Sequence, residues 1–591
     1  MWAILNQLLL LLVITSPLVG IVVVALGFRW GAGRDAIREA VITNSWLTVA
    51  LVGLVVVAFR VPHAPVGEEA SERQRPAIQM NGSMRWLGDS ASRAVMEDVR
   101  SPSHDATLSA KVLPAVRMAW GVDAIQLCFL TMTAILMIPM CLIHPPRPVD
   151  AASATDRKSE AQWYIGILGI GASTMAIVTA QDVVWLMAAV VGLVFLSACV
   201  IGEWGGIARR SAVSSVAVRL GMGSLAFGLA LMGLVYALAW MQFWGGENSF
   251  GPNHLWQRIH MENLSRRFFD PVAGHLWQQM SPVIGLLFCI GAYFWLPIVP
   301  VHRSWTQWWS QSPAALRLFW ISVGSQLGLF GLVEFVLPLF SPLSETAIQS
   351  CGAIGLSGFL YTLCLMSRQT TLVGAMSYGT LAQQGLCFAA MTCGERSALW
   401  GGLLQIVSFS LSSGVILWQR SMGSPIRNGW PRWTVEIATG SLCGVPGTLG
   451  FVSQLLILWG LFRSPVNGEL FFLTLVSWVF SSSIWRRSLT LPLELQESDI
   501  PIAVGENVVN PQEPVSSCRG WSAFGYALIV AVILLGTGLR PALILDRLKP
   551  STQHLALVQR ETKIPQQEVT GERRAKGARH VPKIVNRERH P

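Results

Sequence analysis

The chain has 591 residues, of which 52% are hydrophobic and only 13% are charged, and its mean hydropathy is +0.48. So much apolar surface exceeds what packing in water requires, and it predicts an integral membrane protein rather than a soluble domain. The net charge of +10 does not indicate a nucleic-acid partner, because a basic, polar C-terminal tail accounts for much of the excess.

Apolar runs long enough to cross a hydrocarbon core of about 30 Å, roughly 20 residues each, recur along the chain. They predict an all-α polytopic protein with about 14 transmembrane helices. The first run lacks a basic leader and is too long for a signal peptide, so we expect a retained span. The predicted spans are 8–28, 40–60, 118–143, 162–181, 182–201, 216–241, 281–301, 313–341, 345–367, 370–392, 398–419, 433–462, 467–485 and 521–539.

Three stretches are predicted to lie outside the membrane: 61–115, 242–280 and a tail from about 540. The tail is basic and poor in aromatic residues, which is typical of disorder, and it is either solvated or in contact with anionic lipid or an acidic partner. The predicted organisation is helices 1 and 2 (1–60), an extramembrane loop (61–115), a transmembrane core with helices 3 to 13 (116–485), a loop with helix 14 (486–539) and a disordered tail (540–591).

Short loops on one side of the predicted bundle hold most of the basic loop residues. By the positive-inside rule these loops face the cytoplasm, and an even number of spans then places both termini on the other side. The residues are Arg29, Arg34, Arg38, Arg147, Arg157, Lys158, Arg209, Arg210, Arg420, Arg427 and Arg432.

The sequence holds no motif for a metal or cofactor. Its ten cysteines occur singly, mostly within spans, without the spacing of zinc, iron–sulfur or redox dithiol sites. Phosphate-loop, dinucleotide and haem-attachment motifs are missing from it as well. We therefore expect no cofactor in this chain, no metal site and no catalytic residue of its own.

Two predicted spans contain backbone breakers. Pro297 and Pro300 interrupt the seventh span, and Gly444, Pro446 and Gly447 interrupt the twelfth. Broken helices at matching positions of two halves indicate inverted repeats, here of five helices each, because unwound backbone is tolerated only beside a cavity or inside protein. Proline kinks between packed helices are the alternative.

Five segments together resemble the antiporter-like membrane subunits of respiratory complex I, and among these the M-type (ND4-type) subunit. "WGVDAIQL" (120–127) is similar to the family's "GVDGISL", "PIVPVH" (297–302) to "PLFPFH", and "GVPGTLGFVSQ" (444–454) to "GLPGTSGFVGE". "DVVWLMAAVVGLVFLSACVIGEWGG" (182–206) and "QLGLFGLVEFVLPLFSP" (326–342) follow two further family segments in spacing. The resemblance covers about residues 1–485.

The departures from the family concern charge. In the family, protons are thought to cross along buried ionisable residues, and such residues are costly in lipid and normally functional. In this chain the corresponding positions of the fifth, sixth, seventh, eighth, eleventh and twelfth spans hold neutral residues. These are Val191, Ser215, Trp295, Gln326, Phe409 and Gln454.

A few ionisable residues remain as candidate relay members or remnants. The resemblance makes His302 a retained family position, and histidine titrates near neutrality, although an interfacial belt formed by "HRSWTQWW" is the alternative. Arg219 lies one turn beyond Ser215 and could bias a neighbouring charge. Asp123 fits a helix cap better than a relay, and Glu334 fits a residue at a span end that reaches water.

The resemblance implies a membrane-arm subunit of a complex-I-like NADH:quinone oxidoreductase in an energy-transducing, inner cell membrane. Its partners would be the other membrane-arm subunits and the bilayer, without nucleic acid, and NADH, quinone, flavin and iron–sulfur clusters would belong to partner subunits. The family role is proton translocation coupled to quinone reduction, but the neutral positions predict little proton conduction by this chain. The alternatives are an ion transporter of the related cation/proton antiporter kind, alone or in a small complex, and a structural filler subunit.

Overall fold

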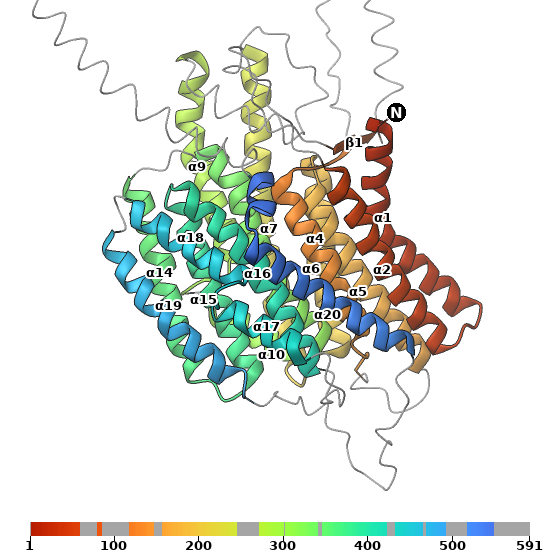
Figure 1. Cartoon of the computed structure of the whole chain (residues 1–591). Coiled ribbons are helices and arrows are strands. Elements are labelled where there is room, and N and C mark those ends of the chain that lie inside the picture. Colours follow the sequence, from red (N-terminus) through yellow and green to blue (C-terminus); the bar gives the residue numbers. More distant parts are fainter. Residues whose placement is uncertain are drawn as a thin grey trace, which may run out of the picture.

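Helices form almost all of the described structure and pack side by side as a bundle (Figure 1). The computed structural model describes residues 2–59, 80–85, 117–146, 156–244, 271–300, 302–340, 345–421, 432–464, 468–491 and 517–548. The helices up to the first interrupted span are α1 (Trp2–Arg29), α2 (Arg34–Ala58), α4 (Ala124–Leu142), α5 (Asp156–Thr179), α6 (Val183–Trp204), α7 (Arg209–Trp244), α9 (Pro271–Trp295) and α10 (His302–Gln311). Those that follow are α11 (Ala314–Ser322), α12 (Leu327–Gly331), α13 (Leu337–Phe340), α14 (Glu345–Ser367), α15 (Leu372–Thr392), α16 (Arg396–Ser421), α17 (Arg432–Leu442), α18 (Leu449–Arg463), α19 (Gly468–Ser488) and α20 (Ser517–Leu539).

Each apolar run that predicted a span coincides with helical residues, which confirms the all-α polytopic class. Within the described residues, ten helical stretches are long and apolar enough to cross a membrane. Two shorter apolar helices, Gln279–Trp295 and Leu449–Arg463, belong to the interrupted spans. Because length and composition identify ten, the count of 14 and the two five-helix repeats remain predictions.

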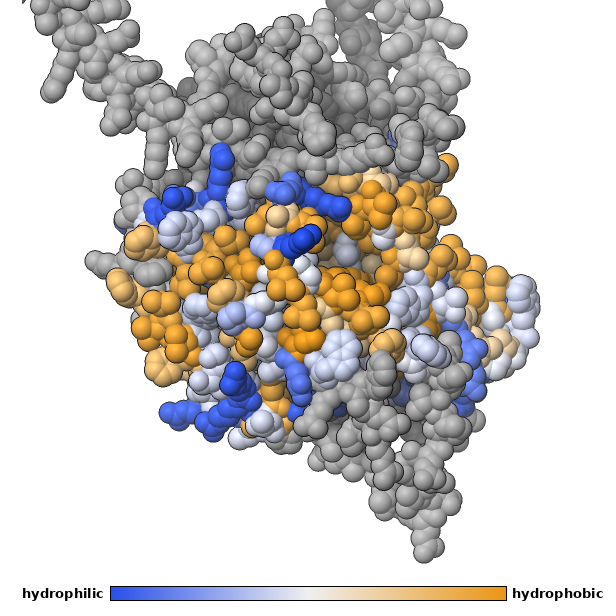
Figure 2. Space-filling model, in the orientation of Figure 1, coloured by the Kyte–Doolittle hydropathy of each residue, from blue (hydrophilic) through white to orange (hydrophobic). Residues whose placement is uncertain are grey.

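The outer faces of the bundle are apolar. Exposed side chains include Val218 and Leu225 on α7 and Leu286 on α9. Figure 2 shows such side chains over a broad band of the bundle, with hydrophilic ones toward its two ends. Exposed apolar surface of this extent is stable against lipid rather than water, so the chain is a multi-pass membrane protein.

The connections predicted outside the membrane lie mostly beyond the described residues, which leave out 60–79, 86–116, 245–270 and 549–591. α7 has 36 residues, about 54 Å at 1.5 Å per residue, which is longer than a hydrocarbon core of about 30 Å. Its end and the start of α9 extend beyond the rest of the bundle (Figure 1). The predicted loop 242–280 therefore begins and ends in helix.

A short antiparallel hairpin is an addition that the helical prediction lacked. β1 (Met80–Arg85) lies within the predicted loop 61–115 and pairs with β2 (Arg117–Val122), with Met80 opposite Val122. Directly after β2, the Asp123 carboxylate accepts a hydrogen bond from the Gln126 backbone at 2.7 Å, and the Gln126 side chain accepts one from the Asp123 backbone. This capping box starts α4 and confirms a structural role for Asp123.

Both predicted helix interruptions are present. α9 ends at Trp295 and α10 begins at His302, so Pro297 and Pro300 lie in the irregular link. α17 ends at Leu442 and α18 begins at Leu449, with Gly444, Pro446 and Gly447 between them. Gly444 and Gly447 have φ values of +69° and +89°, which glycine adopts without the steric cost that a Cβ would bring.

A third irregular region, within the eighth predicted span, was not predicted. α11 is followed by the 3-10 helix η2 (Gly324–Gln326), and α12 by the π-helix η3 (Leu332–Val336). At Gly324 a Cβ would lie 2.8 Å from a ring carbon of Trp320, and at Gly328 it would lie 2.8 Å from the Trp295 carbonyl oxygen. Gly328 therefore lets this span pack against the broken end of α9, whereas Gly324 leaves room for the Trp320 ring of its own span.

The C-terminal helix α20 crosses one face of the bundle diagonally (Figure 1). Residues 542–548 then form a further short helix, in which Arg547 Nη1 donates to the Val56 carbonyl oxygen at 3.1 Å. The prediction of disorder from 540 is wrong for these residues, because contact with α2 orders them; the rest of the tail, 549–591, is outside the described residues.

Candidate functional site: a buried row of neutral polar side chains

Gln326, one of the neutral residues that the resemblance places at a relay position, is part of a hydrogen-bonded pair. Gln326 ends the 3-10 helix η2, and its Oε1 accepts a hydrogen bond from Gln384 Nε2 of α15 at 2.7 Å. Gln384 Nε2 also lies 3.5 Å from Ser325 Oγ. The irregular backbone of the eighth span thus presents an amide to α15 inside the bundle.

A second pair continues from the neighbouring residue of α15. Gln405 Nε2 of α16 donates to Gln383 Oε1 at 2.6 Å. Ser453 Oγ of α18 donates to Gln405 Oε1 and also lies 2.8 Å from the Gly450 carbonyl oxygen. These bonds join α15, α16 and α18, and Ser453 precedes Gln454 in the chain.

We call this set the polar row: Gln326, Gln384, Gln383, Gln405, Ser453 and Gln454. Each of these side chains is no more than 4% exposed. Burial of amides at membrane depth is costly unless they pair, and pairing across helices explains why this sequence places them here.

Gln454 lies against the second interruption. A Cβ at Gly444 would meet Gln454 Oε1 and would lie 2.7 Å from Trp478 Nε1, so this glycine leaves room for both side chains. Within the described residues, Gln454 Oε1 is a buried acceptor that has no hydrogen-bond partner. The break and the amide therefore form one structural unit.

Serine hydroxyls of α16 form further hydrogen bonds to neighbouring helices. Ser408 and Ser441 of α17 have their Oγ atoms 2.8 Å apart, and Gly450 N donates to Ser441 Oγ at 3.1 Å. On the other side, Ser413 Oγ lies 2.8 Å from Ser322 Oγ of α11. These bonds fix α16 between α11 and the interrupted twelfth span.

The first interruption is packed differently, with tryptophans. Trp305, Trp308, Trp309 and Trp320 are fully buried, and ring centroids of neighbouring members lie between 5.0 and 6.1 Å apart. We call them the tryptophan cluster. Because they face the interior, the tryptophans of "HRSWTQWW" do not form the aromatic part of the predicted interface belt, whereas Arg303 is exposed.

Two candidate relay positions lie at the edge of the tryptophan cluster. Trp295, at the end of α9, has its ring centroid 6.4 Å from that of Trp320 and donates from Nε1 to Ser224 Oγ at 3.2 Å. Arg219 is buried, with its guanidinium carbon 5.7 Å from the Trp305 ring centroid. A cation–π contact stabilises the charge there, and an arginine does not release its proton in proteins.

His302 lies apart from the tryptophan cluster, at the first residue of α10. Its ring centroid is 5.5 Å from that of Tyr361 on α14 and 6.4 Å from that of Tyr378 on α15. The side chain is half-buried, and its Nδ1 has no hydrogen-bond partner among the described residues. The structure thus places the titratable ring beside two phenol rings rather than in the polar row.

The other predicted positions are dispersed. Val191 is 58% exposed on the outside of α6, and Ser215 is half-buried on α7. Phe409 is buried, 6.2 Å from the Trp485 ring centroid. Glu334 is only 6% exposed within η3, so its prediction as a residue reaching water is wrong; the π-helix turns it inward.

The chemistry of the polar row follows from its side-chain types. Amides and hydroxyls donate and accept hydrogen bonds, but they do not bind and release a proton in the physiological range. The row can therefore hold helices in register, orient water or offer oxygen ligands. It has no titratable members with which to relay charge.

Sequence reasoning found only Gln326 and Gln454 of the row and missed Gln383, Gln384, Gln405 and Ser453. The available signal was the pair of glutamines at 383–384 within an apolar run, with Gln405 within the next. Amides inside apolar runs predict partners across helices, because an unpaired amide is costly there. Among the described residues, no group of three or more His, Cys, Asp or Glu could hold a metal ion.

Comparison with known proteins gives this site a family context. The chain is 23% identical to NADH-quinone oxidoreductase subunit M of Rhodobacter capsulatus over 455 residues, which cover 74% of this chain and 81% of the relative. It is 26% identical to the subunit M of Pseudomonas aeruginosa over 204 residues, 31% of this chain and only 40% of the relative's length. These relatives are subunits of multi-subunit membrane complexes.

The fold is shared more widely than the sequence. A chain in the structure of respiratory complex I from Thermus thermophilus with bound NADH superposes with a TM-score of 0.65 at 16% identity, covering 93% of this chain and 99% of that one. The model of the NADH:quinone oxidoreductase/Mrp antiporter transmembrane family matches residues 180–481, just over half of the chain. That match contains both interruptions, the tryptophan cluster and the whole polar row, and the chain belongs to this family.

Proposed function

We propose that this chain is a membrane-arm subunit of a complex-I-like NADH:quinone oxidoreductase in which the proton relay of the family is replaced by neutral side chains. The observation that carries the proposal is the polar row, in which Gln326 and Gln454 stand at relay positions, buried and uncharged. The helical fold is similar to that of the complex I chain described above, with a TM-score of 0.65. The subunit then contributes scaffold to an arm whose proton transport occurs in other subunits.

The tryptophan cluster supports the same function. Proton transfer through a membrane protein needs titratable groups or connected water, and packed indole rings leave space for neither. At the first interruption Trp295 stands at a relay position that the resemblance identifies, and the tryptophan cluster packs beside it. Among the described residues, the polar row and the tryptophan cluster thus each consist of side chains that do not relay protons, for different physical reasons.

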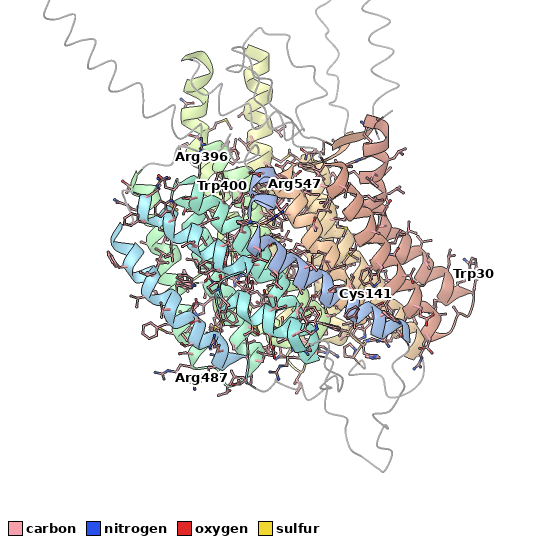
Figure 3. All side chains as sticks on the ribbon, viewed as in Figure 1. Trp30, Cys141, Arg396, Trp400, Arg487 and Arg547 are labelled. Carbon is pink, nitrogen blue, oxygen red and sulfur yellow. The ribbon has the colours of Figure 1, made fainter. Side chains whose placement is uncertain are left out.

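The chemistry of quinone reduction belongs, on this proposal, to other subunits. NADH, flavin, iron–sulfur clusters and quinone would bind there, and this chain would contact its partners through apolar helix faces. The end of the bundle that holds Arg487 would face the cytoplasm, because Arg420, one of the basic loop residues, donates to the Leu489 carbonyl oxygen there (Figure 3). The N-terminus and Arg547 lie toward the opposite end, so both termini would be non-cytoplasmic (Figures 1 and 3).

Proton flux tests the proposal directly. The purified chain is reconstituted in proteoliposomes, and decay of an imposed pH gradient is compared with that of empty liposomes and of an M-type subunit from a competent complex. We expect decay close to that of empty liposomes. Flux comparable to the positive control would overturn the neutral-relay proposal and require a path through other residues.

Assembly is tested separately by isolating the chain from its native membrane. We expect it to co-purify with other polytopic subunits and with redox subunits of the same complex. Migration alone, near its mass of 64.5 kDa, would contradict the subunit assignment whatever the flux result.

The second candidate is a cation transporter of the related antiporter kind. Two buried sets of hydrogen-bonded amide and hydroxyl oxygens, Gln326 with Gln384 and Gln383 with Gln405 and Ser453, favour it, since uncharged oxygens can replace the hydration shell of an alkali cation. The same proteoliposomes loaded with Na⁺ or K⁺ separate the two candidates. Cation flux without proton flux would favour the transporter.

A further inference from the structure

The C-terminal helix α20 touches the backbone of the second interruption. At Gly538 a Cβ would lie 2.5 Å from the Thr448 carbonyl carbon and 2.7 Å from its Cα, and it would also meet the Gly447 carbonyl oxygen. Any other residue at 538 must displace one of the two segments, because the neighbours are backbone rather than flexible side chains. Glycine thus allows main chain to rest on main chain.

The touched residues determine where α18 begins. Gly447 has a φ of +89°, and Thr448 is the residue before the first turn of α18, the helix that carries Ser453 and Gln454. The hydrogen bonds that hold the link include those from Val445 N to the Gly440 carbonyl at 2.8 Å, from Thr448 N to the Val445 carbonyl at 3.2 Å, and from Gly450 N to Ser441 Oγ at 3.1 Å. A shift at 447–448 would move the start of α18 and with it the end of the polar row.

The other parts of α20 are anchored to elements away from the interruption. At Gly525 a Cβ would lie 2.8 Å from the Trp46 ring of α2, so the ring packs against α20 where this glycine leaves room for it. Tyr526 is fully buried, with its ring centroid 5.3 Å from that of Trp418 on α16. Beyond the helix, Arg547 donates to the Val56 carbonyl oxygen at the end of α2. Figure 3 shows Arg547 at the end of this diagonal path.

We propose that α20 is a clamp that positions the interrupted twelfth span. Its contacts with α2 and α16 hold the helix in place, and Gly538 presses against Gly447 and Thr448, so the unwound link keeps its conformation. Gly538 is a positioning residue that acts through the link on Gln454 and its neighbour Gly444. This inference concerns the conformation of the link and does not depend on whether the chain conducts protons.

The test compares Gly538→Val with Gly536→Val. A Cβ at Gly536 meets no atom within 4 Å, so both substitutions change helix propensity alike and only the first one meets the link. Hydrogen exchange of the full chain in lipid nanodiscs is followed by mass spectrometry. The peptides compared cover the link at 443–450 and, as an internal reference, the first interruption at 296–300.

We expect Gly538→Val to raise the exchange rate of the 443–450 amides about tenfold or more, because their local opening becomes easier. The 296–300 reference should exchange as in the wild-type chain, as should both segments in Gly536→Val. If Gly538→Val fails to fold, Gly538→Ala provides the smaller displacement, and a rise confined to 443–450 is expected there too. Unchanged exchange at 443–450, equal effects of the two Val variants, or a uniform rise across the chain would overturn the clamp.

Discussion

Gln405 makes the central pairings of the polar row, so its replacement by leucine measures what the row contributes to stability. Gln405→Leu removes the bond to Gln383 Oε1 and the acceptor of Ser453 Oγ. Ser453 Oγ still has the Gly450 carbonyl oxygen as an acceptor. The Gln383 amide oxygen, in contrast, loses its donor, Gln405 Nε2.

The expected cost follows from the membrane setting. An orphaned buried polar group costs about 1–3 kcal/mol in proteins generally. Hydrogen bonds between membrane helices average about 0.6 kcal/mol, with a maximum of about 1.7 kcal/mol, because the unfolded state in lipid also finds partners. Gln405→Leu removes the hydrogen bond to Gln383 and one of the two acceptors of Ser453 Oγ. We therefore expect the free energy of unfolding to fall by about 1–2 kcal/mol.

A double-mutant cycle with Gln383→Leu isolates the pair. Removing both amides leaves apolar groups facing each other, which is close to neutral, so the double variant should be more stable than the sum of the single losses predicts, by about 1 kcal/mol. The assay is equilibrium unfolding in lipid–detergent mixed micelles. Thr174→Val is the control, because Thr174 Oγ1 donates to the Ile170 carbonyl oxygen of its own helix and, within the described residues, makes no hydrogen bond to another helix. Additivity of Gln383→Leu and Gln405→Leu within about 0.3 kcal/mol would refute the pairing.

Three further predictions address charge and capping. Gln454→Glu should leave pH-gradient decay in proteoliposomes unchanged, because desolvation favours the protonated form of a lone buried carboxyl; proton flux at the level of a competent subunit would contradict this. His302→Ala should leave proton-coupled activity of the assembled complex unchanged, since His302 lies beside Tyr361 and Tyr378 rather than in the polar row; abolished coupling with intact assembly would instead identify it as a working relay residue. Asp123→Ala should lower the free energy of unfolding by about 1 kcal/mol through loss of the α4 cap, whereas Asp123→Asn should retain most of it, and equal losses in the same unfolding assay would argue against capping.

The sequence by itself determined the medium, the helical class and the two interruptions. Apolar runs of membrane length are local signals, and so are Pro297, Pro300 and the glycines at 444 and 447, because these residues limit the backbone wherever they occur. The neutral residues at 326 and 454 were also readable, since the resemblance of segments 326–342 and 444–454 to family segments places them. Asp123 was readable as a cap because capping involves residues three positions apart.

Only the tertiary structure decided which side chains meet and which faces are buried. In a membrane protein, lipid-facing and interior helix faces are both apolar, so hydropathy does not separate the buried Trp305 from the exposed Val191. Two of these features join residues that are distant along the chain: the pairing of Gln405 with Gln383 and the contact of Gly538 with Thr448. A third, the inward orientation of Glu334, depends on the local geometry of a π-helix. Such contacts arise from the packing of helices against one another, which linear pattern and composition do not specify.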